Sequence, residues 1–149
     1  LAENELKVHI ISTKDLRVEK EVKLEIPGFY KKMPVDFYTF KKYDKPSENY
    51  QKDIEYWQTA YSRIQKVIIE DNFLILQMRT VSDQLKKFAL LFYNAENFKL
   101  EKIIFSNDLL LGARDGKYYF YANGDPGRDE EAEDFIIHIY SFGDKNEKK

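Results

Sequence analysis

The chain has 149 residues and no cysteine, which excludes disulfide scaffolds, thiolate zinc sites and cysteine nucleophiles. The chain has 24 Lys and Arg residues and 26 Asp and Glu residues, which gives a net charge of -2. This charge does not indicate electrostatic attraction to nucleic acid or to an anionic membrane. The longest apolar run, Phe88 to Tyr93, is too short for a membrane-spanning helix. We therefore expect a single globular domain over residues 1–149, with no nucleic-acid partner and no transmembrane segment.

Alternation of apolar and polar residues predicts strands along most of the chain. In chain order they cover residues 6–12, 17–26, 35–42, 64–70, 73–80, 87–94, 99–105, 109–114, 117–123 and 135–142. The connections Asp71-Asn72 and Asp115-Gly116 contain residue types that tolerate the positive φ of two-residue hairpin turns. Residues 64–105 are therefore predicted to form a four-stranded antiparallel meander.

One segment between these strands has a helical period. Ser47 is a suitable N-cap, and an apolar stripe follows it at spacings of four, three and four: Tyr50, Ile54, Trp57 and Tyr61. This pattern predicts a short amphipathic helix over residues 48–60, within an insertion at about 46–61. We interpret the stripe as the docking face of the helix rather than as a ligand platform. Residues 143–149 form a polar tail.

Segments of the chain repeat one another. Residues 8–22 align with residues 90–104, which places Leu16 on Phe98 and Lys20 on Lys102, and residues 137–141 repeat the first strand of this unit again. A strand, a turn and a second strand that recur in this way indicate a repeated β unit. The first unit then has only its two outer strands, and the last has three strands without the outer fourth.

The repeated units predict an all-β fold of four-stranded antiparallel blade-type meanders, which is a partial β-propeller with one short inserted helix. About three units are present, whereas propellers have about four to eight blades. An unpaired strand edge and sheet faces exposed to water both lower the stability of an isolated monomer. We therefore expect either a homodimer or a partner that completes the missing strand.

Several strands also carry a family resemblance. Residues 62–69, 71–77 and 88–93, together with residues 105–110, 117–123 and 135–140, resemble the C-terminal blades of six-bladed, TolB-like β-propeller lipoproteins of bacterial envelopes. The resemblance covers residues 60–142 and, more weakly, 6–26, and its motifs are strand patterns rather than catalytic signatures. The lipobox cysteine of such proteins is absent, as expected of a C-terminal fragment.

The resemblance implies a location in the bacterial cell envelope, either periplasmic or surface-exposed. It also implies a non-enzymatic binding or scaffolding module with a protein or carbohydrate ligand. The alternative is a carbohydrate- or peptide-processing propeller enzyme whose site lies partly in blades outside this chain.

Five residues are candidate ligand contacts. Asp108, Arg114 and Asp115 lie near the ends of one predicted strand, and propellers bind ligands at loops around their channel. Tyr119 and Tyr121 are expected to face outward, because the rings of residues 118 and 120 alternate with them and enter the core. Ordinary packing between blades is the alternative for the two tyrosines.

Other polar groups are given a structural interpretation. The two histidines, His9 and His138, occupy equivalent repeat positions and are interpreted as packing positions rather than as catalytic or metal-binding residues. Residues 124–134 include six carboxylates, but their spacing matches no EF-hand and Arg128 opposes a cation, so a solvated loop is favoured over a calcium site. No catalytic residue, metal site or cofactor is predicted, because no phosphate, zinc or dinucleotide motif occurs.

Overall fold

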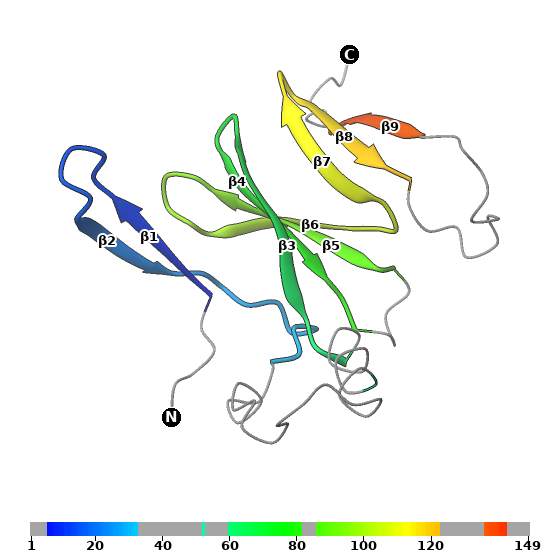
Figure 1. The fold of residues 1–149 in the computed structure, drawn as a ribbon, viewed down its shortest axis with the longest axis horizontal. Helices are drawn as coiled ribbons and strands as arrows, with labels where there is room; N and C mark the ends of the chain where they lie inside the picture. The colour runs from blue at the N-terminus through cyan, green and yellow to red at the C-terminus, as the bar shows by residue number, and fades with distance from the viewer. Residues whose placement is uncertain (1–5, 33–51, 53–59, 82–85, 123–135, 143–149) are drawn as a thin grey trace, which may run out of the picture.

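The computed structural model describes residues 6–32, 52, 60–81, 86–122 and 136–142, and these contain three antiparallel sheets (Figure 1). The first sheet is a hairpin of β1 (Lys7–Ile11) and β2 (Val18–Lys23). The second is a meander of β3 (Arg63–Glu70), β4 (Phe73–Arg79), β5 (Phe88–Asn94) and β6 (Leu100–Ser106). The third contains β7 (Leu109–Arg114), β8 (Lys117–Tyr121) and β9 (Ile137–Ser141).

The predicted all-β fold and its four-stranded antiparallel meander are confirmed. The described ranges contain no helical element. The predicted helix over residues 48–60 falls outside the described residues, apart from Lys52 and Ala60. The predicted strand 35–42, the acidic loop 124–134 and the polar tail 143–149 also lie outside them.

The three sheets pack face to face, with the four-stranded sheet in the middle (Figure 1). Its two central strands, β4 and β5, are buried between their end residues because both faces of this sheet are covered. Successive side chains point to opposite faces of a strand. Thus Leu91 packs toward the first sheet with Leu6 and Leu24, whereas Phe92 packs toward the third sheet with Leu110.

Aromatic rings fill the layer between the second and third sheets. The Phe92 ring meets the rings of Phe73, Tyr118 and Phe142 edge-on, at centroid distances of 5.9, 5.9 and 5.8 Å. The Lys102 ammonium group lies 5.8 Å from the Phe92 centroid and 5.2 Å from that of Phe142. Edge-to-face pairs and a cation over a ring both add to the burial energy, so this layer joins the two sheets strongly.

Two buried side chains also tie the central sheet to its neighbours through polar bonds. The Tyr93 hydroxyl donates to the carbonyl oxygen of Glu25, just beyond β2, at 2.7 Å. Burial, assisted by the charge of Glu25, raises the pKa of this hydroxyl to about 12, so it stays a donor at neutral pH. On the other side, the Gln77 amide bonds to the backbone of Asp108 and Leu110.

Backbone geometry supports the sequence repeat. The non-glycine residues with positive φ among the described residues form two equivalent pairs, Leu16 (56°) with Phe98 (60°) and Asp71 (51°) with Asp115 (52°). In the first pair the amide donates to the carbonyl four residues earlier, at 2.9 Å for Leu16 and 2.8 Å for Phe98. Equivalent turns thus have equivalent conformations, including the left-handed residue.

We expect the backbone of Leu16 to be strained, with little side-chain packing to offset the strain. Leu16 is 80% exposed, and a left-handed backbone costs a residue other than glycine about 1–2 kcal/mol. Leu16→Gly should therefore raise the free energy of unfolding in urea by about 0.5–1 kcal/mol, after allowance for the greater chain entropy of glycine. Phe98→Gly relieves the same strain, yet it should destabilise, because Phe98 packs on the core and the Lys20 ammonium lies 5.8 Å from its ring centroid. Equal effects of the two substitutions would contradict this account.

Candidate functional site

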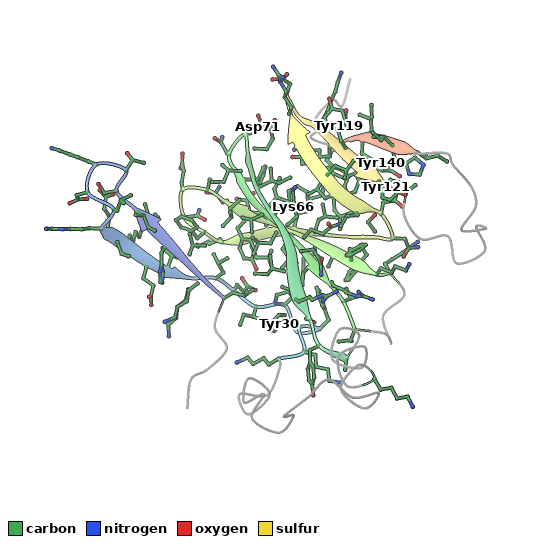
Figure 2. The ribbon with its side chains drawn as sticks, in the orientation of Figure 1. Tyr30, Lys66, Asp71, Tyr119, Tyr121 and Tyr140 are labelled. Carbon is green, nitrogen blue, oxygen red and sulfur yellow. The ribbon has the colours of Figure 1, made fainter. Side chains whose placement is uncertain are left out.

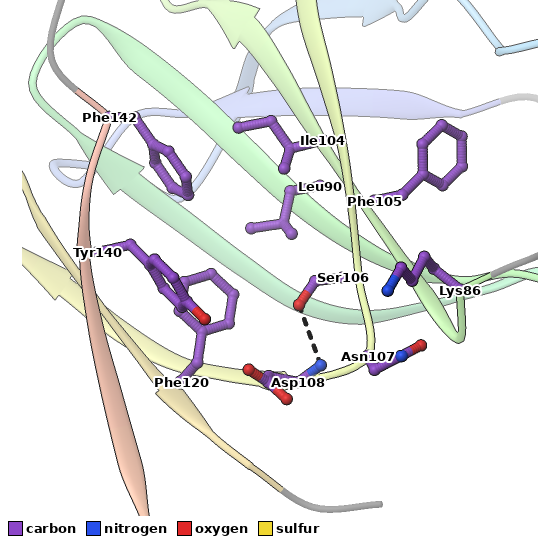
Figure 3. Close-up of a pocket in the computed structure, with 10 residues that line it drawn as sticks. All are labelled: Lys86, Leu90, Ile104, Phe105, Ser106, Asn107, Asp108, Phe120, Tyr140 and Phe142. Atoms are coloured by element: carbon purple, nitrogen blue, oxygen red, sulfur yellow. Dashed lines mark hydrogen bonds between the residues drawn. The ribbon is translucent and has the colours of Figure 1, made fainter. Parts of the chain in front are cut away.

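A pocket of about 270 Å³ opens between the second and third sheets, next to the β6–β7 connection (Figure 3). Its wall is made mostly of apolar and aromatic side chains: Leu90, Ile104, Phe105, Phe120, Tyr140 and Phe142. Its polar lining consists of Lys86, Ser106, Asn107 and Asp108. An apolar cavity with a few polar groups on one side is the usual form of a ligand site.

The aromatic wall comes from two adjacent strands of the third sheet. Phe120 of β8 is buried by the same alternation that places Tyr118 in the core. The Tyr140 ring of β9 meets Phe120 edge-on at 5.3 Å, and it lies parallel to the Phe142 ring with the centroids 6.2 Å apart. These contacts fix the orientation of Tyr140, although its ring is partly exposed.

The polar side of the pocket is organised by the short turn between β6 and β7. The Ser106 hydroxyl oxygen accepts a bond from the Asp108 amide at 3.0 Å (Figure 3), and the Asp108 carbonyl accepts one from the Gln77 amide at 2.9 Å. The Asn107 side-chain oxygen accepts from the Lys87 amide at 3.2 Å. The backbone of the turn is therefore held from three directions, and the Asp108 carboxylate has a defined position.

The Asp108 carboxylate pairs with a histidine from β9. Its Oδ2 atom lies 2.9 Å from Nδ1 of His138, and the Tyr140 hydroxyl lies 3.5 Å from the same nitrogen. The Asp108 side chain is mostly covered, whereas that of His138 is about half exposed. Within the described part of the chain, Nε2 of His138 has no hydrogen-bond partner. A carboxylate that holds one ring nitrogen leaves the other available to a ligand.

Of the five predicted contact residues, Asp108 alone lines the pocket. Arg114 and Asp115 lie at the opposite end of β7, with Arg114 Nε 3.5 Å from Asp115 Oδ2 and both side chains more than four-fifths exposed. A strand rises about 3.4 Å per residue, so Arg114, at the far end of β7, is separated from Asp108 by about 20 Å. The three residues do not converge on one site.

Tyr119 and Tyr121 lie on the third sheet (Figure 2). Because side chains alternate along β8 and Phe120 lines the pocket, these two tyrosines are on the opposite face of the strand. Their half-buried rings alternate with the buried rings of Tyr118 and Phe120, as the sequence predicts. The register pairs them with Ile139 and Ile137 of β9, which are both exposed. This outer face is apolar and separate from the pocket.

The two histidines, which the sequence suggests are equivalent packing positions, lie at the surface of their sheets. Both are about half exposed, and each pairs with a carboxylate at 2.9 Å: His9 through Nε2 with Glu21, and His138 through Nδ1 with Asp108. Their equivalence in the repeat could have indicated a polar role, because a histidine occupies the same position in both β1 and β9. Sequence reasoning missed Tyr140 and Phe142 as pocket residues, and it missed His138 as the partner of Asp108, because their contacts are with residues distant in the sequence.

The edge of the third sheet borders this pocket. Among the edge strands that the structure describes, β9 alone contains no Lys, Arg, Asp or Glu. The Ala122 amide donates to the Ile136 carbonyl, and the register then directs the backbone groups of residues 137, 139 and 141 away from β8. Natural sheets usually protect an open edge with charges. The β9 edge is therefore suited to accept another strand.

No protein-family model, no curated protein and no solved structure matches the chain. The residues that the structure describes include no helix long and apolar enough to cross a membrane. Within the same ranges, no three side chains of His, Asp or Glu come together as metal ligands would. The functional assignment therefore depends on the pocket and on the β9 edge.

Proposed function

We propose that the chain is a non-enzymatic binding module of a bacterial cell-envelope β-propeller protein, and that it binds an extended segment of a partner protein along β9. Three stacked antiparallel sheets support the propeller assignment, as does the contact of β3 with β7, which are the first strands of consecutive sheets. First strands of propeller blades are neighbours around the central channel. The resemblance of residues 60–142 to TolB-like lipoproteins supports the envelope location.

The observation that carries the binding role is the edge of β9, which is uncharged and, among the described residues, unpaired. In the first two sheets the strand equivalent to β9 pairs with an outer antiparallel strand, as β1 does with β2 and β5 with β6. Among the described residues β9 pairs with β8 alone. A strand added here would gain backbone hydrogen bonds from the edge and would place alternate side chains over the pocket.

A synthetic peptide with the sequence of residues 98–106, which include β6, is the first probe. We expect it to bind the chain in a fluorescence anisotropy titration, and we expect Ile139→Pro to weaken binding by about tenfold. Proline at this position removes an outward N–H without removing a bond to β8, so the fold should persist in circular dichroism. Ile139→Ala is the matched control, because it shortens the same side chain and keeps the N–H.

Two results would overturn the proposal. One is the absence of peptide binding to the unmodified chain, or equal binding by the Ile139→Pro variant. The other is self-association through β9, which would appear in light scattering as a mass that rises with concentration and falls to the monomer value in Ile139→Pro. In that case the occupant of the edge is a second copy of this chain.

A carbohydrate- or peptide-processing activity is the second candidate, and the Asp108–His138 pair favours it. A carboxylate that orients an imidazole is a common general-base arrangement. The pocket lining, however, contains one carboxylate, whereas glycosidases normally use two. Hydrolysis of nitrophenyl glycosides or peptide anilides by the chain, lost in His138→Gln, would select this candidate over the binding role.

A further inference from the structure

We infer that the partner strand carries a carboxylate directly opposite His138. This inference depends on the proposed binding role, since it specifies the chemistry of the segment that β9 accepts. It follows from how the same position is filled in the other two sheets. In the sequence repeat, β1, β5 and β9 each correspond to the third strand of a four-stranded unit. His9 of β1, Leu91 of β5 and His138 of β9 are equivalent residues of this strand.

In the first two sheets, where an outer strand is present, the residue opposite this position is chemically complementary to it. Glu21 of β2 stands opposite His9, and its Oε2 atom lies 2.9 Å from His9 Nε2. Ile103 of β6 stands opposite Leu91, so an apolar residue faces an apolar one. A histidine in the third strand therefore has an acidic cross-strand partner, and His138 presents the same requirement to the strand that joins β9.

The titratable and charged groups around His138 are compatible with a second carboxylate at its ring. Among the described residues, Asp108 bonds to Nδ1 and Tyr140 is the other titratable group that contacts the ring, while Lys86 lines the adjoining pocket with Asp108. Phe120, opposite His138 on β8, contributes no charge. With a carboxylate on Nε2 as well, both ring nitrogens would donate, which requires the imidazolium form. A charge-assisted bond of this kind favours a carboxylate over an uncharged group opposite His138.

The residue of the partner strand that stands opposite Ile139 should be a lysine. Lys20 and Lys102 are equivalent in the repeat and stand opposite Ile10 and Phe92, and this position corresponds to Ile139 in β9. Each ammonium group lies near an aromatic ring of the following sheet, Phe98 for Lys20 and Phe142 for Lys102. β2 and β6 both begin with an apolar residue, Glu and Lys, and the residue after this lysine stands opposite the histidine position. The expected partner segment therefore has the inferred carboxylate directly after the lysine.

A pair of synthetic peptides tests the carboxylate. One has the sequence of residues 15–23, which supplies a glutamate at position 21, and the other carries Glu21→Gln. We expect the glutamate peptide to bind about fivefold more tightly than the glutamine peptide. His138→Gln should remove this preference, because the charge-assisted bond is lost.

The outcomes separate this inference from the proposed function. If both peptides bind equally, or if His138→Gln leaves the preference unchanged, the carboxylate assignment is wrong while the β9 edge still binds a strand. If neither these peptides nor the 98–106 peptide binds, both the inference and the binding role fail. Binding that persists in Ile139→Pro would place the peptide elsewhere and would also overturn the inference.

Discussion

Replacing Gln77 with leucine is expected to lower the free energy of unfolding by about 3 kcal/mol. Gln77 is fully buried in β4, and its amide donates to the Asp108 carbonyl and accepts from the Leu110 amide, both at 2.9 Å. Leucine has a similar size but bonds to neither group. Two backbone groups between the second and third sheets would then lose their partners in a region that water reaches poorly.

Urea unfolding followed by circular dichroism measures this loss, and Gln65→Leu is its matched control. Gln65 lies at the irregularity between β3 and β4 and is exposed, so the same change there should alter stability by less than about 0.5 kcal/mol. Because Gln77 also holds the Asp108 turn, Gln77→Leu should weaken peptide binding in the folded protein. Equal stability of the two variants would show that the Gln77 amide does not hold the sheets together.

Much of the strand layout could be predicted from sequence because its signals are local. The predicted strand 109–114 coincides with β7, and the other strands found agree with prediction to within a few residues at each end. The Asp71 and Asp115 turns were also predictable, since both residue types tolerate positive φ. Leu16 and Phe98 gave no such signal, because leucine and phenylalanine rarely adopt that conformation. Their equivalence appeared only in the repeat alignment.

The candidate site could be predicted only in part, because it combines residues that are distant in sequence. Asp108 was identified, but it was grouped with Arg114 and Asp115, its neighbours along the chain. In the structure, Asp108 instead pairs with His138 and lines the pocket together with Tyr140, and the register of Phe120 with His138 places β9 beside it. This pairing depends on the register of the β8–β9 pair, and no local pattern in the sequence specifies it.

Phe92→Ala and Leu91→Ala are expected to loosen different parts of the molecule, although the two residues are adjacent in β5. Each change removes a large buried side chain and should cost about 3–4 kcal/mol of stability. Phe92 packs against the third sheet, so its loss should speed hydrogen exchange of the β7–β9 amides. Leu91 packs against the first sheet with Leu6 and Leu24, so its loss should speed exchange in β1 and β2.

Native-state hydrogen exchange with mass spectrometry can distinguish these responses, because each sheet yields its own peptides. Sheets that open separately behave as repeat units, whose stability is a sum of internal terms and contacts between neighbours. In that case Phe92→Ala should also weaken peptide binding at β9, whereas Leu91→Ala should leave it near the unmodified value, since the pocket lining lies on the Phe92 side of the central sheet. If both variants instead speed exchange evenly across the three sheets, the chain unfolds as one cooperative unit. A partner strand on β9 would then stabilise the first sheet as much as the third.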